Sequence, residues 1–180
     1  MVRHFVISVI VIAFLAMSFV VVQNWKIADN SAVTFKIKSM LGTVDGSVGG
    51  LKGTIMFDPA DVKNSRMDVT LDLSTIKTGI DKRDKDIKEE EVWFDIAKYP
   101  LIAFKSTSIT KTATGYLVDG TLTMKGVSKK EQIPFTYVGD GNSGSFTGTL
   151  KLNRLDFNVG KSSAAVKDDV EIAINVPVKR

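Results

Sequence analysis

The 180-residue chain contains no cysteine and only one histidine, His4. Without cysteine, the fold cannot be held by disulfides, and both thiol catalysis and thiolate-bound metals are excluded. Because His4 lies at the extreme N-terminus, the rest of the chain has no imidazole for acid–base catalysis or metal binding. We therefore expect no metal site and no cofactor.

Motifs typical of common enzymes are also missing. The sequence has no G-x-S-x-G, no H-E-x-x-H, no Walker loop and no G-x-G-x-x-G followed by a helical pattern. Two sets of acids could supply paired carboxylates, Asp58 with Asp61 and the run from Glu89 to Glu91, but such exposed acids are typical of solvated surface. We predict that the protein is not an enzyme and has no catalytic residues.

Neither positive nor negative charge dominates the chain. The formal net charge is +4, and basic residues alternate with acidic ones along the chain. Nucleic-acid binding is not expected, because no basic stripe with aromatic stacking partners is present. The small positive excess is compatible with a membrane surface.

Residues 1–23 form a distinct N-terminal segment. A short basic start precedes an almost wholly apolar run from Phe5 to Val22. This pattern is typical of an export signal, and its length is also near the lower limit for a membrane span. Two interpretations stay open: a signal peptide cleaved near Ser18, and an uncleaved membrane anchor. Both predict an extracytoplasmic domain, periplasmic or secreted, formed by residues 24–180.

The rest of the chain is dominated by alternating polar and apolar residues, the pattern of half-buried β-strands. Gly42 to Gly50 is rich in glycine and predicts a turn or a bulge, and Pro134 and Pro177 indicate strand positions at an edge or a bulge. Eight or nine strands at near-regular spacing predict an all-β antiparallel barrel or sandwich. The expected strands are 25–27, 33–38, 51–57, 67–73, 102–109, 116–124, 132–138, 145–152 and 170–178.

One charged insert, from Asp81 to about Val92, lacks this alternation. We predict a short helix there, with Asp81 as its cap and Asp84 in the first turn, where carboxylates suit the helix dipole. Its charges fit either a solvated crossover helix or a lid that closes one end of a barrel.

Four motifs in and after this insert resemble those of the YceI family, in the same order. They are the Arg83–Asp84 pair, the segment from Trp93 to Pro100, the stretch from Gly120 to Lys129, and Asn153-Arg-Leu-Asp-Phe157. The resemblance covers roughly residues 25–178. Members of this family are bacterial, lipocalin-like β-barrels that bind polyisoprenoid lipids. One departure is that relatives often carry histidine where this chain has Asn30, Ser39 and Asp86.

The resemblance implies a lumen that holds the apolar tail of an isoprenoid lipid or a quinone-like amphiphile. Periodicity alone does not distinguish a lumen from a filled core. Inward-facing glycines, expected at Gly53, Gly120 and Gly148, would either leave volume or relieve strain. The expected ligand-binding residues are Phe35, Ile37, Trp93, Phe94, Phe104, Leu122, Met124 and Phe146, with Arg83 at the mouth near an anionic head group or paired with an acid.

Two further expectations concern structure and partners. Arg154 is expected to brace the last strands through Asp156. The alternative function is a membrane-anchored, extracytoplasmic protein-interaction module with a solid core. The oligomeric state stays open, and a homodimer is one option.

Overall fold

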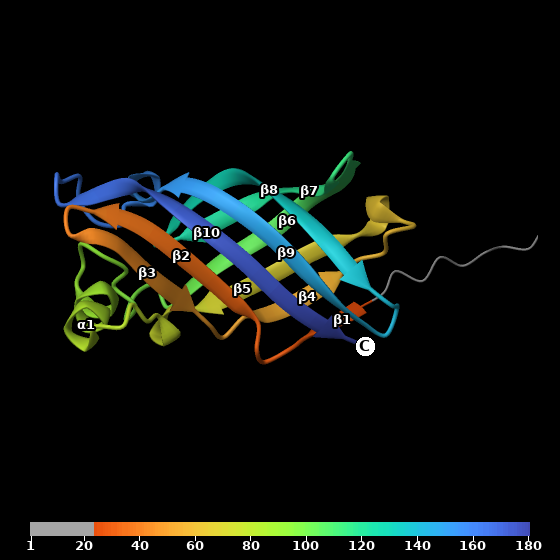
Figure 1. Ribbon diagram of the computed structural model, residues 1–180, viewed down its shortest axis with the longest axis horizontal. Coiled ribbons are helices and arrows are strands. Elements are labelled where there is room, and N and C mark those ends of the chain that lie inside the picture. The colour runs from red at the N-terminus through yellow and green to blue at the C-terminus, as the bar shows by residue number, and fades with distance from the viewer. Residues whose placement is uncertain (1–23) are drawn as a thin grey trace, which may run out of the picture.

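The computed structural model describes residues 24–180, so the expected leader lies outside the described residues. Ten strands form one antiparallel sheet in the order β1-β4-β5-β6-β7-β8-β9-β10-β2-β3, and pairing of β1 with β10 closes it (Figure 1). The closed ring thus contains eight strands, β1 and β4 to β10. The prediction of an antiparallel barrel of about eight strands with one short helix is confirmed.

The strands follow the expected alternation closely. Their bounds are β1 Asn24–Ile27, β2 Ala32–Ser39, β3 Gly42–Val48, β4 Lys52–Met56, β5 Arg66–Asp72, β6 Leu101–Thr112, β7 Gly115–Met124, β8 Val127–Gly139, β9 Ser143–Asn153 and β10 Val166–Lys179. Short 3-10 turns lie at Val62–Asn64, Leu73–Thr75 and Arg154–Phe157. Among residues 24–180, no helix is long and apolar enough to cross a membrane.

Residues 42–48 of the glycine-rich segment form a strand, β3, so the expected turn or bulge is wrong for them; Gly49 and Gly50, the latter with φ of +65°, connect β3 to β4. Gly46 pairs directly with Phe35 of β2. A Cβ at Gly46 would clash with the tip of the Phe35 ring, so the missing side chain makes room for the ring. Glycine here therefore serves packing between neighbouring strands.

The other inward glycines differ in their roles. The space beside Gly120 is occupied in the same way, because a Cβ there would clash with the ring of Phe104. Gly148 does line the interior cavity described below. Gly53 is exposed, with φ of +128°, and a Cβ there would collide with the carbonyl oxygen of Asp68. Of the two expected roles, relief of backbone strain therefore fits Gly53, and leaving volume does not.

Pro134 marks the point where β8 and β9 separate. Pairing between these strands runs only from Phe135↔Gly148 to Gly139↔Gly144. Proline has no N–H to continue the ladder, which agrees with the predicted irregular position. Pro177 lies within β10, beside the break between β1 and β2, where its carbonyl accepts a hydrogen bond from the Ala28 amide at 2.9 Å.

The helix α1, Asp81–Glu89, is shorter than expected and is capped differently. Its N-cap is Ile80, which makes no side-chain cap bond. Instead, the Asp84 carboxylate accepts hydrogen bonds from the amide (2.8 Å) and the hydroxyl of Thr78. Asp84 can reach back to the preceding turn, whereas Asp81 is already the first helical residue. Figure 1 shows α1 beside the β2–β3 turn at one end of the barrel.

Candidate functional site

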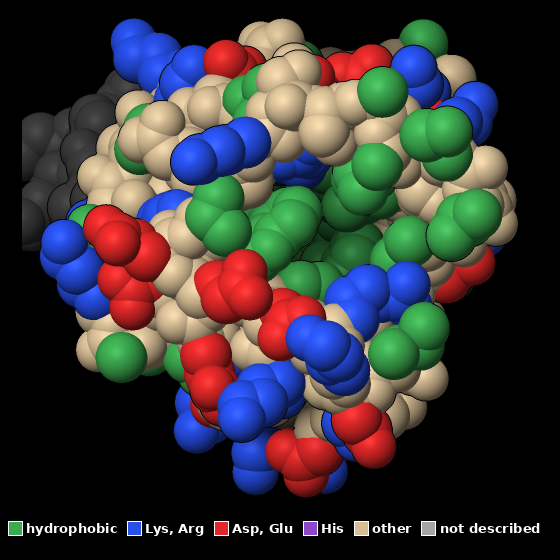
Figure 2. Space-filling view, turned by 90° about the vertical axis from the view of Figure 1, so that its left-hand side faces the viewer, with side chains coloured by type: hydrophobic (Ala, Val, Ile, Leu, Met, Phe, Trp, Pro, Cys, Tyr) green, Lys and Arg blue, Asp and Glu red, His purple; other side chains and the backbone are tan. Residues whose placement is uncertain are grey.

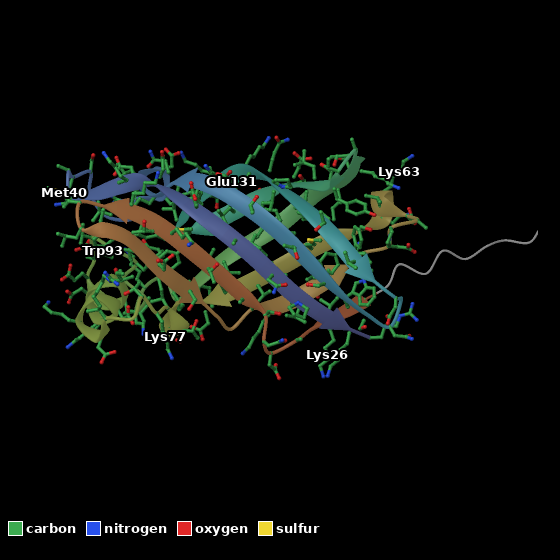
Figure 3. All side chains as sticks on the ribbon, viewed as in Figure 1. Lys26, Met40, Lys63, Lys77, Trp93 and Glu131 are labelled. Carbon is green, nitrogen blue, oxygen red and sulfur yellow. The ribbon has the colours of Figure 1, made fainter. Side chains whose placement is uncertain are left out.

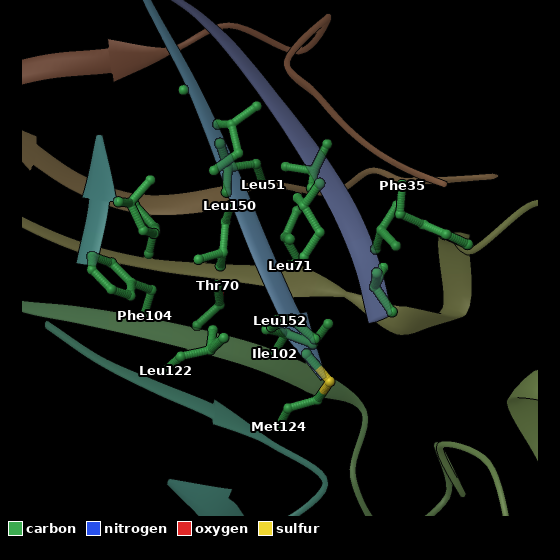
Figure 4. A pocket seen from close by; sticks show the side chains of 18 of the residues that line it. Phe35, Leu51, Thr70, Leu71, Ile102, Phe104, Leu122, Met124, Leu150 and Leu152 are labelled. Carbon is green, nitrogen blue, oxygen red and sulfur yellow. The ribbon is translucent and has the colours of Figure 1, made fainter. Parts of the chain in front are cut away.

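The interior of the barrel contains an apolar cavity of about 230 Å³. Every strand except β1 contributes to its lining, because alternate residues of each strand point inward. Figure 4 shows side chains from separate strands, among them Phe35, Leu71, Leu122 and Leu150, facing one common space. The barrel core is therefore not completely filled by its own side chains.

The lining is almost wholly hydrocarbon. Thr70 and Arg154 are the two lining residues that are neither apolar nor glycine. The other residues are Val33, Phe35, Ile37, Val48, Leu51, Ile55, Met67, Val69, Leu71, Ile76, Ile87, Trp93, Phe94, Ile102, Phe104, Val118, Leu122, Met124, Ile133, Phe135, Phe146, Gly148, Leu150, Leu152, Val159, Val170, Ile172, Ile174 and Val176. Such a surface can exclude water from an apolar ligand, but it offers few groups to orient a polar one.

An aromatic cluster closes one end of the cavity. Phe57 is fully buried, with ring centroids 5.0 Å from Tyr116 and 5.3 Å from Phe146 in edge-on arrangements. Trp25 packs against Tyr137 and donates its indole N–H to the carbonyl of Phe57 at 2.9 Å. Phe57 belongs to this plug and lies outside the cavity lining.

The opposite end, which carries α1, is hollowed. Figure 2 looks onto this end and shows a depression with hydrophobic side chains at its bottom and charged side chains around it. Trp93 and Met40 lie at this end (Figure 3). We call this opening the mouth.

Backbone hydrogen bonds bring Trp93 and Phe94 to the cavity. After α1 ends, the amide of Trp93 bonds the carbonyl of Glu90 (2.9 Å), and that of Phe94 bonds Ile87 (3.1 Å). The chain thus folds back under the helix and directs both aromatic residues inward. Ile87 is the residue of α1 that lines the cavity, so the helix end is part of its wall.

Lys125, which the sequence analysis did not single out, holds the rim together. Its ammonium donates to the carbonyl oxygens of Glu91 (2.6 Å), Val92 (3.2 Å) and Asn158 (2.7 Å). Burial lowers the pKa of Lys125. The β7–β8 turn, the segment after α1 and the turn before β10 are joined through this one side chain. No local pattern signals such a contact, because the three segments are far apart in sequence.

Eight of the nine residues expected to bind ligand line the cavity: Phe35, Ile37, Trp93, Phe94, Phe104, Leu122, Met124 and Phe146. Their role in binding stays a prediction, since no ligand is present. The ninth, Arg83, is outside the lining. Its guanidinium donates to the hydroxyl and the carbonyl oxygen of Thr78, both at 2.7 Å, and so fixes α1 to the preceding turn.

Arg154 is buried and structural, but its expected partner is wrong. Its guanidinium bonds Asp168 at 2.7 Å and the carbonyls of Val159 (2.8 Å) and Lys161 (3.0 Å). Asp156 lies two residues away on the same turn, a spacing that points side chains apart, and it pairs with Lys129 at 3.1 Å.

Within residues 24–180, no three His, Cys, Asp or Glu side chains gather as they would around a metal ion. In the same part of the chain, no buried side-chain nitrogen or oxygen lacks a hydrogen-bond partner.

Several solved structures have a fold similar to that of this barrel. Solved structures with the same fold include Burkholderia cenocepacia BcnA, with a TM-score of 0.76 and 29% identity over 82% of this chain and 95% of that one. The Campylobacter jejuni YCEI protein has a TM-score of 0.70 and 26% identity, covering 76% and 85%. A polyisoprenoid binding domain from Saccharophagus degradans has a TM-score of 0.64 over 87% and 97%, and at 14% identity it shows the fold alone.

Sequence relatives agree with this placement. A UPF0312 protein of Pectobacterium atrosepticum is 28% identical over 160 residues, which is 84% of this chain and 82% of that protein. One from Vibrio parahaemolyticus is 28% identical over 153 residues, covering 81% and 80%. The family model of the YceI-like domain matches residues 25–178. The chain therefore belongs to the YceI-like domain family.

Proposed function

We propose that the domain binds a long-chain isoprenoid lipid or an isoprenoid quinone, with the apolar tail inside the cavity. The observation that carries the proposal is the hydrocarbon lining, which comes from every strand except β1 and encloses an unfilled space. The structure from Saccharophagus degradans that has the same fold is a polyisoprenoid binding domain, so a barrel of this kind can hold this ligand class.

The energetics favour binding through the tail. An isoprene unit has five carbons, and at about 0.8 kcal/mol per buried CH₂ it contributes roughly 3–4 kcal/mol before costs. A few buried units therefore suffice for tight binding, even after ordering and association costs are subtracted. The head group then needs no dedicated site and stays at the solvated mouth.

The size of the cavity limits how much of the tail it holds as it stands. About 230 Å³ is more than the roughly 150 Å³ cavity that accepts benzene, and less than the roughly 300–1,000 Å³ of typical ligand pockets. A long tail requires side chains to move apart or part of the tail to stay in the mouth. Met67 and Met124 are unbranched and flexible, and both line the cavity.

We propose binding, storage or transport without catalysis. Residues 24–180 contain neither cysteine nor histidine, and the lining offers no pair of titratable side chains facing one another in the cavity. The unfilled interior favours this function over the alternative of an interaction module with a solid core.

The location is proposed to be extracytoplasmic, on the basis of the apolar segment before Asn24. A fusion of residues 1–24 to a reporter that is active only outside the cytoplasm should be active. The intact mass of the exported protein then decides between a cleaved signal and an anchor. An inactive reporter overturns the location but leaves lipid binding untouched.

Lipid binding is tested by extracting the purified full chain with organic solvent and identifying the extract by mass spectrometry. The expected result is a polyprenyl lipid or quinone in near-stoichiometric amount. Protein without bound lipid should take up added polyprenol. If the chain neither carries a lipid nor takes up polyprenol or quinone, the proposal is wrong.

A further inference from the structure

The rim of the mouth carries an exposed apolar surface that the cavity does not use. Met40 is 75% exposed and Leu41 fully exposed, at the turn between β2 and β3. The amide of Met40 bonds the carbonyl of Ala165 at 3.0 Å, so this turn lies against the loop before β10. Ala164 and Ala165 of that loop are exposed as well. We call residues 39–43 and 162–166 together the tip surface.

The first charged residues that flank the tip surface along the chain are mostly basic. Neither of its two segments contains a charged residue, and the first charges on three of its four flanks are Lys38, Lys161 and Lys167, all exposed. The fourth flanking charge, Asp45, is paired with Lys36 at 3.1 Å. Nearby Asp168 is already engaged by the buried Arg154 at 2.7 Å. An apolar tip edged by lysines that form no direct ion pair within residues 24–180 matches the layering of an anionic membrane, whose apolar interior lies beneath negative head groups.

The tip surface also lies where a lipid would enter or leave. Met40 is at the hollowed end of the barrel (Figures 2 and 3), whereas the described chain begins at Asn24, at the plugged end (Figure 1). We propose that the tip surface docks the mouth on an anionic lipid bilayer, so that a tail passes between bilayer and cavity without crossing water. The inference rests on the proposed lipid-binding function and adds its membrane contact.

The test uses single cysteines, because the native chain has none. Leu41→Cys in the full chain is labelled with an environment-sensitive fluorophore. Vesicles of phosphatidylcholine with anionic phosphatidylglycerol should shift its emission to the blue, and vesicles of phosphatidylcholine alone should do so less. Added salt should weaken the shift, because it screens the lysines. The matched control is Val138→Cys. Val138 is an apolar residue of β8 that is 75% exposed, and it lies close to the C-terminal end of β10. The emission of a label at this position should not shift.

A second variant reverses the flanking charges, with Lys38→Glu, Lys161→Glu and Lys167→Glu in the labelled chain. The vesicle concentration that gives half of the blue shift should rise at least about tenfold, since each basic residue near a surface contributes to binding. The inference is wrong if the Leu41→Cys label does not shift, or if both labels shift equally because residues 1–23 alone hold the chain on the vesicle. A shift that grows with protein concentration without vesicles would instead indicate contact with a second copy. The lipid content of the unlabelled protein is measured separately, so a failure of docking is distinguishable from a failure of lipid binding.

Discussion

The guanidinium of Arg154 lies 5.7 Å from the ring centroid of Trp93, between the cavity wall and the start of β10. Gly160 leaves the room for this packing, since a Cβ there would meet both side chains. Arg154 is 3% exposed, and its other contacts are to Asp168 and to backbone carbonyls. The one charged residue in the lining is therefore fully engaged by the protein and positions Trp93 at the mouth.

Arg154→Ala should destabilise the fold strongly. Removing one partner of a buried pair costs about 3–5 kcal/mol, and here several carbonyls also lose their donor. Denaturant titration would measure the loss. Lys151→Ala is the control, because Lys151 and Glu171 are paired at 3.1 Å but largely exposed, so little change is expected. A loss for Arg154→Ala as small as that of the control would contradict a structural role.

Alternation along the strands was enough to predict an antiparallel β domain and the inward face of the expected ligand-binding residues, whereas the resemblance to the YceI family favoured a barrel with a lumen. Phe35 and Ile37, or Leu122 and Met124, are two residues apart and must face the same side of a strand. The sequence could not show whether their shared space is filled, because that depends on the side chains of all strands together.

The errors arise where a residue's role depends on a distant part of the chain. Gly46 has no side chain of its own to signal a strand, and only the Phe35 ring across the sheet explains it. Arg154 has an acid two residues away, but it selects Asp168, which folding brings near. The three carbonyls around Lys125 likewise come from segments that only the closed barrel brings together.

Gly46→Ala should destabilise the domain by roughly 1–3 kcal/mol, because the added methyl must displace the Phe35 ring. In combination with Phe35→Leu the loss should be smaller than the sum of the single losses, with a coupling of about 0.5–3 kcal/mol in a double-mutant cycle. Gly49→Ala is the control, since its nearest contact would be an ordinary 3.6 Å to the Thr75 hydroxyl. If the losses of stability from the two substitutions are additive, Gly46 is needed for the backbone conformation and not for packing of the Phe35 ring.

Glu131→Gln should stabilise the protein at neutral pH and not in acid. Burial raises the pKa of Glu131, and Asp156 raises it further, while Lys129 opposes them. The folded state holds the proton of this carboxyl more tightly than the unfolded state does. The protein therefore loses stability as the pH rises from the unfolded pKa through the folded pKa. The penalty is therefore present at neutral pH, where glutamine removes it, and absent well below the ordinary value of 4.5.

The melting temperatures of Glu131→Gln and of the wild-type protein, measured at neutral pH and well below pH 4.5, test this prediction. Glu171→Gln serves as a control of opposite sign, because the hydrogen bond from Lys151 lowers the pKa of Glu171. Its contribution is present above the unfolded pKa and is lost as the pH falls through the folded pKa, so Glu171→Gln should slightly lower the melting temperature at neutral pH only. A lowered melting temperature for Glu131→Gln at neutral pH would contradict the assignment for Glu131.

Leu122→Trp distinguishes a working cavity from a packing defect. Leu122 is buried, but it borders the open space of the cavity (Figure 4). The larger ring can enter that space, so the lipid-free domain should lose little stability, whereas lipid content by mass spectrometry should fall sharply because a tail cannot pass the ring. The control is Leu73→Trp, at a fully buried position outside the cavity lining, where overpacking should cost roughly 1–3 kcal/mol or more. If Leu122→Trp is as unstable as Leu73→Trp and still carries the wild-type amount of lipid, the tail does not pass Leu122.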